Sequence, residues 1–416
     1  MKFIKAIGGA AAVLAGAMLG AWGQDFRTDI NPGLIYYQAF LVSSEGLSSS
    51  NMDYVQSNAW RAQPLPERFD AIFAGYSNQL RLVRQAAHST VPCDWGIDWS
   101  MGSETLLPQL ARAKSVAQTA CYRARWELQR NQPAEAVDDL AAAFVLGRNS
   151  GCDGSLIAVL VQEAIQNIVA TTVAENFGEF PRDELGKLAV GMQTAPPEAT
   201  MAAAMVMENN MHAVWWPTWI HGLQAKYGGD DTKVVAAIRT VFDYDGDGEP
   251  SRHEDWLKLA AAAGGTSDGF LKLMQDLQPL AQQLTEAMAL PEAQYEAATN
   301  QLNAAMQTST NPLAQMLLPA VIKARPREFA ALETEAMLQA AIAYKLNGAA
   351  GLNSVMDPYG TGPFQFQRFM FQGVDRGFEL KGAYTGRGFP ERMIFVETRG
   401  APFYLNGAKV GQPPTP

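Results

Sequence analysis

Helical spacing of apolar residues runs through most of this chain and limits its fold more than any other feature. In residues 104–130 the apolar side chains recur along one stripe, which is typical of an α-helix with one buried face. The turn Asn131-Gln132-Pro133 leads into residues 134–148, which keep the same spacing. The pattern predicts an antiparallel helical hairpin and a mainly α fold, an irregular bundle of such hairpins.

The same spacing predicts further helices on both sides of this hairpin. They are expected at residues 34–42, 66–88, 155–176, 181–192, 196–227 with an interruption at Pro217, 267–289, 291–306 and 326–347. Two more helices flank residues 243–254, and the second of them is expected to end at Gly264-Gly265. After Asn347 the chain alternates apolar and polar residues, at 363–371, 377–382 and 392–397. Alternation with period two is typical of half-buried strands, so we expect a small C-terminal antiparallel β-meander.

The first residues have the character of an export signal. Lys2 and Lys5 precede a short apolar run, and small residues stand at Ala21 and Gly23. This order indicates a signal peptide cleaved before Gln24, with no transmembrane span in the mature chain. The expected regions are the signal peptide 1–23, an N-terminal helical-hairpin region 24–195, a helical region 196–350, and the C-terminal β-meander with a Pro-rich tail 351–416.

Charge and composition narrow the function. Cleavage of the signal changes the formal net charge from −10 to −12, because two lysines are removed. Nucleic acid is not an expected partner of so acidic a protein, since phosphate contacts need a basic surface. No nucleophile, metalloprotease or phosphate-loop pattern stands in the strand–helix or helical setting that it needs, so the sequence leans away from an enzyme.

Residues 243–254 fit the calcium-loop pattern D-x-[DN]-x-[DN]-G-x5-E at every fixed position. Ca²⁺ takes roughly six to eight oxygen ligands, and Gly248 at the sixth position permits the sharp turn. The expected ligands are Asp243, Asp245, Asp247, Glu249, Ser251 and Glu254. The loop resembles that of the EF-hand, which implies Ca²⁺ as a cofactor held between two helices.

Two positions depart from the usual EF-hand loop. Pro250 at position 8 has no N–H to pair with a second loop, and Asp255 stands at position 13, where an apolar residue normally packs. Both indicate a lone structural site, not half of a paired sensor. Outside the cytoplasm, calcium is plentiful enough to fill a site with a Kd of about 10⁻⁴–10⁻³ M.

Three cysteines follow the signal segment. Export into an oxidising compartment allows one disulfide and one free thiol. Cys93 and Cys152 lie in loop-like contexts, whereas Cys121 lies inside a predicted helix, so Cys93–Cys152 is the favoured pair. Three reduced cysteines are the alternative, because sequence does not determine connectivity.

An aromatic segment offers a second candidate site. Trp215, Trp216 and Trp219 could stack on sugar rings or an apolar ligand, and His212 and His221 could bind a metal. The two histidines are nine residues apart and point to opposite faces of a straight helix. A buried aromatic contact is therefore the simpler interpretation.

A third candidate is the turn around Asp94 and Asp98, next to Trp95 and Trp99. Two carboxylates beside aromatic rings could form the acid/base pair of a glycoside hydrolase. Capping of nearby backbone N–H groups explains the same residues.

Some segments resemble known families. Residues 134–148 resemble the second helix of a tetratricopeptide-type unit. Asp357-Pro358-Tyr359-Gly360-Thr361-Gly362-Pro363-Phe364 followed by a Gly377-Phe378-x-Leu380 strand resembles the C-terminal module of exported helical proteins abundant in planctomycete-type bacteria, and the turn at residues 93–98 is similar to the same group. The C-terminal segment is also similar to the small sheet of pseudopilins. These resemblances imply architecture and export, and no activity.

Two main hypotheses for function follow, and a third, assembly into a surface or pilus-like complex, rests only on the C-terminal segment. The first is an exported, periplasmic or extracellular calcium-binding protein of the cell envelope, non-enzymatic, with a structural Ca²⁺ site and an interaction or scaffold role toward another envelope or extracellular protein. The alternative is a secreted hydrolase or carbohydrate-binding protein that uses the Asp94/Asp98 turn or the Trp215/Trp216/Trp219 surface.

Overall fold

The structure, a computed structural model, describes residues 27–42, 51, 54, 64–242, 250–371, 373–386 and 392–398, without the side chains of residues 250–252. The expected signal peptide 1–23 and most of the Pro-rich tail lie outside the described residues.

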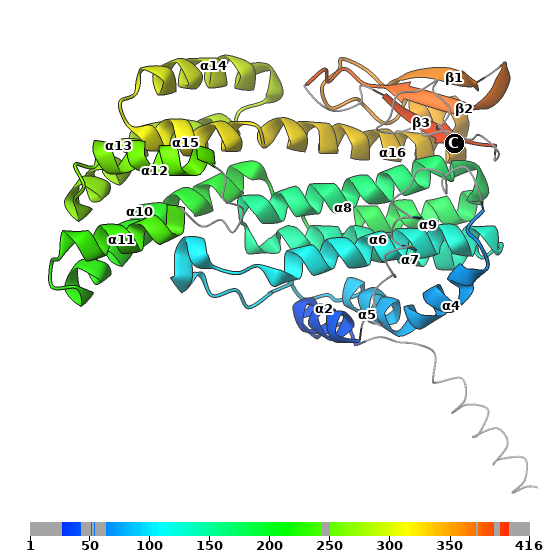
Figure 1. The fold of residues 1–416 in the computed structure, drawn as a ribbon. Coiled ribbons are helices and arrows are strands. Elements are labelled where there is room, and N and C mark those ends of the chain that lie inside the picture. Colours follow the sequence, from blue (N-terminus) through cyan, green and yellow to red (C-terminus); the bar gives the residue numbers. More distant parts are fainter. Residues whose placement is uncertain are drawn as a thin grey trace, which may run out of the picture.

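The first part of the chain forms a helical lobe around the predicted hairpin (Figure 1). Its arms are α6 (Pro108–Gln129) and α7 (Pro133–Ser150), and the turn between them places Asn131 at φ 57°. Helix α8 (Leu156–Glu175) packs against both arms. The other elements of this first lobe are α2 (Pro32–Leu41), α4 (Arg68–Gly75), α5 (Ser77–Ala87), η2 (Trp99–Glu104), η3 (Gly151–Asp153), η4 (Phe177–Glu179) and α9 (Arg182–Gln193).

The middle of the chain forms a second lobe, green to yellow at the left of Figure 1. Its helices are α10 (Met201–Lys226), α11 (Asp231–Phe242), α12 (Pro250–Ala262), α13 (Ser267–Met288), α14 (Glu292–Thr308) and α15 (Pro312–Ile322). The long helix α16 (Arg325–Leu352) then runs from the second lobe back along the first, where it packs on α8 and α9.

The C-terminal segment forms the predicted meander. Strands β1 (Gln365–Phe371), β2 (Val374–Lys381) and β3 (Arg392–Val396) pair antiparallel in the order β1-β2-β3. Phe378 of β2 lies opposite Phe395 of β3 and both are buried. Their rings contact Phe177 of η4, at centroid distances of 5.5 and 5.2 Å. The mainly α class with a small antiparallel sheet is confirmed.

Buried side chains gather into two main clusters that follow the lobes. The first cluster takes its residues from Ile35 to Met192 and again from Met337 to Phe395. The second takes nearly all of its residues from Met201 to Ala330. Because α8 and α16 contribute to both clusters, these two helices join the lobes.

Helix α8 is, among the described residues, the one helix that is long and apolar enough to cross a membrane by length and composition. Half of its apolar window is buried inside the protein. It also contains the buried polar residues Gln162, Glu163 and Gln166, as expected of a helix that packs in the centre of a bundle.

Several predicted boundaries were wrong. The helix predicted at residues 66–88 is broken at Tyr76 into α4 and α5, and the bend lets Phe73 and Leu80 both face the core. The helix expected from residue 104 begins only at Pro108, which occupies its first turn. The preceding residues form η2 instead, where Gly102 has a φ of 53° and lies against the ring of Trp215.

Predictions that used proline as a marker of helix boundaries were also wrong. Helix α10 starts at Met201, capped by Thr200, and not at Pro196. It continues through Pro217 without a break, although proline removes one backbone donor. Helix α15 was not predicted, and it contains Pro319 as well as Pro312 in its first turn.

Candidate functional site

The calcium-loop segment lies between two described helices of the second lobe. Helix α11 ends at Phe242 and α12 begins at Pro250. Asp243, Asp245, Asp247 and Glu249 lie outside the described residues, as does the side chain of Ser251. Glu254, the expected closing ligand, is on the described part of α12, where its side chain is exposed. Within the described residues there is no group of three or more His, Cys, Asp or Glu that could hold a metal, so the site depends on the loop itself.

An aromatic stack joins the two helices beside this loop. The ring of Phe242, the last residue of α11, lies 6.4 Å from that of Trp256 on α12. Trp216 of α10 stacks on Phe242 at 5.4 Å, and Phe270 of α13 stacks on Trp256 at 5.5 Å. The row therefore connects four helices and fixes the position of both ends of the loop relative to α10 and α13.

The outer ends of the helix pair are also attached to α13. Asp231, the first residue of α11, accepts hydrogen bonds from the backbone N–H of Ser267 at 2.9 Å and from its hydroxyl at 2.6 Å. These bonds hold the pKa of Asp231 below its usual value. At the end of α12, Gly264 and Gly265 have φ of 63° and 68°, which turns the chain directly into α13.

The acidic residue at position 13 of the loop is explained by the packing of α12, in which the following residue is buried instead. Asp255 is at the surface and pairs with Lys258 at 3.2 Å. The next residue, Trp256, takes the buried place with only 6% of its surface exposed, and Leu259 is fully buried three residues later. The acidic residue at position 13 is thus compatible with a packed second helix.

The tryptophan segment is part of the interior of the second lobe and of its contact with the first. Trp216 is buried, while Trp215 and Trp219 are half-buried and stack on each other at 5.3 Å. The indole N–H of Trp215 donates to the carbonyl of Ser100 in η2 at 3.1 Å.

The two histidines of this segment lie in different surroundings. His212 is half-buried and burial lowers its pKa, whereas His221 is exposed.

The Asp94/Asp98 turn is held by hydrogen bonds to its own backbone. One oxygen of Asp94 accepts from the N–H of Gly96 at 2.8 Å, and one of Asp98 accepts from the N–H of Ser100 at 2.9 Å. The second bond lowers the pKa of Asp98, whose carboxylate caps η2. These contacts agree with the capping interpretation.

Trp95 anchors the same turn in the first lobe. Its ring is 4% exposed and stacks on Tyr36 at 5.5 Å, and its N–H donates to the carbonyl of Asn149 at 2.7 Å. The turn therefore packs against α2 and the end of α7, so the residues around Asp94 have a structural role.

The thiols of Cys93 and Cys152 are neighbours. A hydrogen bond between the two side chains, together with burial, raises the pKa of Cys93 well above its usual range. Cys93 is half-buried, Cys152 is exposed on η3, and Cys121 is fully enclosed in the core, where burial raises its pKa to about 12. The fold thus brings the favoured pair together and keeps Cys121 apart.

Residues 265–269 read G-x-S-x-G, the pattern of a serine nucleophile on a strand-to-helix turn. Here the segment joins two helices, α12 and α13, and Ser267 is 3% exposed. Its hydroxyl donates to Asp231, in the contact between α11 and α13 described above.

The sequence did not predict which residues of α10 and α13 hold the two helices beside the calcium loop in place. Phe270 and Ser267 lie on α13, beyond the loop, and Trp216 lies on α10 before it. The apolar spacing of each helix marks these residues as buried, but no local signal shows that they meet. Comparison of the chain with protein-family models, curated proteins and solved structures found no match.

Proposed function

We propose that this chain is an exported calcium-binding protein of the cell envelope, in which the loop 243–254 holds one Ca²⁺ ion for a structural purpose. The strongest support is that the complete twelve-residue pattern follows directly on α11 and runs into the first turn of α12, two helices that are joined by the Phe242–Trp256 contact. In this proposal the protein acts by contact with another protein of the envelope or the exterior, and not by catalysis.

A single loop is sufficient for calcium binding because the two helices beside it are held in place. Helices α11 and α12 are attached to α13 through Asp231 and Phe270. Because these contacts hold the two helices in place, calcium binding does not have to order them, and less of its binding free energy is lost to that cost. A lone site with Pro250 at position 8 needs no partner loop.

Export would supply the ion. The expected signal peptide leads to the periplasm or the exterior, where calcium reaches the concentrations that weak sites of about 10⁻⁴–10⁻³ M require. The mature chain is acidic, with a formal charge of −12 once Lys2 and Lys5 are removed, which suits a protein that meets divalent cations.

A role in protein contact is supported by apolar side chains on the surface of the first lobe. Leu34 and Leu41 of α2 are 58% and 85% exposed, and the adjoining Val42 is 49% exposed. Exposed apolar residues that gather in one place often mark contact surfaces.

The alternative, a secreted hydrolase or carbohydrate-binding protein, has less support. The carboxylates of Asp94 and Asp98 accept backbone hydrogen bonds that a catalytic pair would have to give up. Trp216 is buried, and Trp215 is engaged with Ser100. A sugar would have to displace these contacts to stack on the rings.

The test is thermal unfolding of the mature chain with millimolar calcium and with a chelator. Ligand binding to the native state stabilises it by RT ln(1 + [L]/Kd), about 1.4 kcal/mol when free calcium is ten times Kd. We expect a rise of about 1–3 °C in Tm with calcium for the unmodified chain, and no rise for the double variant Asp243→Ala/Glu254→Ala.

The matched control is Asp255→Ala/Asp276→Ala, which removes two surface carboxylates from the same lobe, each paired with a lysine. This control keeps the calcium effect if the loop is the site. An equal calcium effect in all three proteins would exclude the loop, and no effect in any of them would exclude a structural calcium role.

A further inference from the structure

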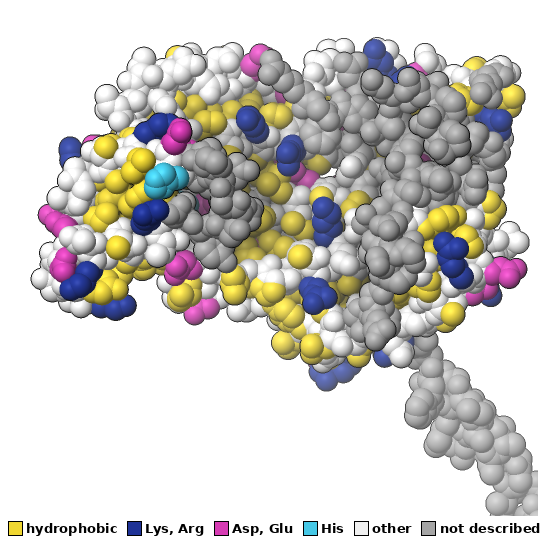
Figure 2. Space-filling model, viewed as in Figure 1, with side chains coloured by type: hydrophobic (Ala, Val, Ile, Leu, Met, Phe, Trp, Pro, Cys, Tyr) yellow, Lys and Arg dark blue, Asp and Glu magenta, His cyan; other side chains and the backbone are white. Residues whose placement is uncertain are grey.

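A cleft separates the facing sides of α8 and α16 at the junction of the two lobes. Its volume is about 570 Å³, within the usual range of small-molecule sites, about 300–1,000 Å³. Apolar side chains from both helices make up much of its lining, among them Leu160, Ala164 and Ala331. Figure 2 shows this region as a hollow with a hydrophobic floor and Lys and Arg side chains along its edge.

Glu163 of α8 is the buried polar group of this cleft. The residue is 6% exposed, and its Oε1 has no hydrogen-bond partner among the described residues. The neighbouring acids differ from it in this respect. Glu328 pairs with Arg325, and Glu335 pairs with Arg148 at 2.8 Å. A buried polar atom without a partner is costly to a fold, so Glu163 is a group that a ligand could satisfy.

The free charges in the cleft are positive. Arg327 and Lys323 line it and are exposed, and neither side chain has a hydrogen bond or ion pair with the described residues. Glu163 does not offset them at neutral pH, because burial and the nearby carboxylates of Glu328 and Glu198 raise its pKa to about 8. A neutral carboxyl group donates a hydrogen bond, and two cations attract an anion.

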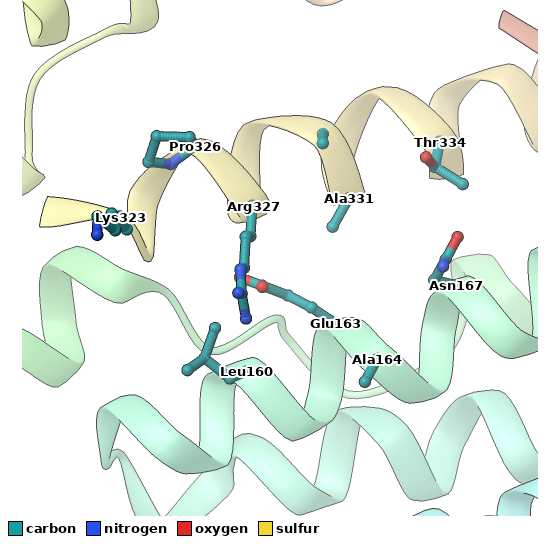
Figure 3. Close-up of a pocket in the computed structure, with 10 residues that line it drawn as sticks. Leu160, Glu163, Ala164, Asn167, Lys323, Pro326, Arg327, Ala331 and Thr334 are labelled. Atoms are coloured by element: carbon teal, nitrogen blue, oxygen red, sulfur yellow. The ribbon is translucent and has the colours of Figure 1, made fainter. Parts of the chain in front are cut away.

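The polar groups of the cleft lie at its two ends. Figure 3 shows the side chains of Arg327 and Glu163 reaching toward one another from facing helices. Further along the same helices, Thr334 and Asn167 point toward each other, with Ala331 on the helix between. A ligand that fits this arrangement has an acidic head, an apolar body and room for a polar group at the far end.

We propose that the α8–α16 cleft binds a small amphiphilic carboxylate, with its head at Arg327, Lys323 and Glu163 and its apolar body between Ala164 and Ala331. Its binding needs neither the loop 243–254 nor calcium, so it stands or falls independently of the calcium proposal.

The test is isothermal titration of the full mature chain with probes that share a size and differ in the head group. Decanoate, 1-decanol and decylamine are titrated below their micelle-forming concentrations, and 4-phenylbutyrate distinguishes an aromatic from an aliphatic body. We expect saturable binding of at least one of the two carboxylates. Decanol and decylamine should bind at least about tenfold more weakly than decanoate, because each lacks the charge-assisted bonds to the two cations.

Variants locate the binding in the cleft. Arg327→Gln/Lys323→Gln should weaken carboxylate binding at least about tenfold, and Ala331→Phe should abolish it by filling the cleft. Glu163→Gln should keep it at neutral pH, since an amide still donates. The matched controls are Arg112→Gln/Lys114→Gln, on the exposed face of α6, and Ala304→Phe, on the exposed face of α14.

Each variant is first checked for an unchanged circular dichroism spectrum and melting curve. Three results would overturn the proposal: neither carboxylate binds the unmodified chain, decylamine or decanol binds as tightly as the tighter-binding carboxylate, or Ala331→Phe binds as well as its control.

Discussion

The ring of Phe242 lies 6.4 Å from the ring of Trp256, across the seven undescribed residues that separate α11 from α12. This contact joins α11 and α12 on the side that faces the core of the second lobe. It makes the two helices on either side of the calcium-loop segment part of one packed structure.

Removal of the Trp256 ring should weaken both stability and calcium binding. Truncation of a buried tryptophan costs about 3–5 kcal/mol, and loss of the contact with Phe242 frees one end of the loop. Calorimetric titration of Trp256→Ala with calcium should give a higher Kd than that of the unmodified chain.

Trp95→Ala is the control, because Trp95 is equally buried, with 4% exposed, but lies in the first lobe. It should lower stability and leave the calcium Kd unchanged. If the two variants bind calcium alike, the aromatic stack does not support the loop.

Oxidation should join Cys93 to Cys152, whose thiols are hydrogen-bonded neighbours. Peptide mapping of the exported protein without reductant should recover this pair and a free Cys121. The bond should add about 2–4 kcal/mol to the free energy of unfolding, chiefly by restricting the unfolded chain.

Cys93→Ser should therefore lose this increment, whereas reductant should remove it from the unmodified chain and have no effect on the variant. Recovery of three free thiols from oxidised, folded protein would refute the pairing.

Glu163 should make stability fall as pH rises. Its pKa in the folded protein is about 8, above the ordinary value of 4.5, so between these values the folded state holds a proton that the unfolded state has released. Stability then decreases with pH across that window. Burial dominates the shift, Glu328 and Glu198 add to it, and Arg327 and Arg325 oppose it.

Glu163→Gln removes this penalty, so it should raise the free energy of unfolding by about 1–3 kcal/mol at pH 8 and change it little at pH 4.5. Denaturant unfolding at the two pH values measures the difference. Glu335→Gln is the contrasting variant. Burial raises the pKa of Glu335 as well, but its carboxylate pairs with the buried Arg148, and loss of this partner should lower stability at pH 8. A loss of stability in both variants would show that Glu163 is paired after all.

Local chemistry was enough to predict much of the fold. Asn131-Gln132-Pro133 marks the α6–α7 turn by residue type alone, and Gly264-Gly265 marks the end of α12, since both need conformations with positive φ or a proline at a helix start. The period-two alternation around Phe378 was equally informative. These signals lie within a few residues of the feature that they determine.

The predictions that were wrong concern features determined by contacts between residues far apart in the sequence. The helix predicted at residues 66–88 is broken at Gly75 and Tyr76, because α4 and α5 each pack an apolar face on the core. Pro217 does not break α10, which packs along α13 and whose Trp216, next to the proline, stacks on Phe242 of α11. Glu163 and Arg327 line the same cleft although 163 residues separate them in the sequence, so no local spacing indicates it. The ligands of the calcium loop were identified by pattern, and their geometry lies outside the described residues.

Calcium binding by the loop 243–254 is the central claim, and equilibrium dialysis of the mature chain against calcium tests it most directly. We expect one ion per chain with a Kd of about 10⁻⁴–10⁻³ M or tighter, and no bound ion in Asp243→Ala/Glu254→Ala at the same free calcium. Absence of binding by the unmodified chain at millimolar calcium, or equal binding by the double variant, would contradict the account.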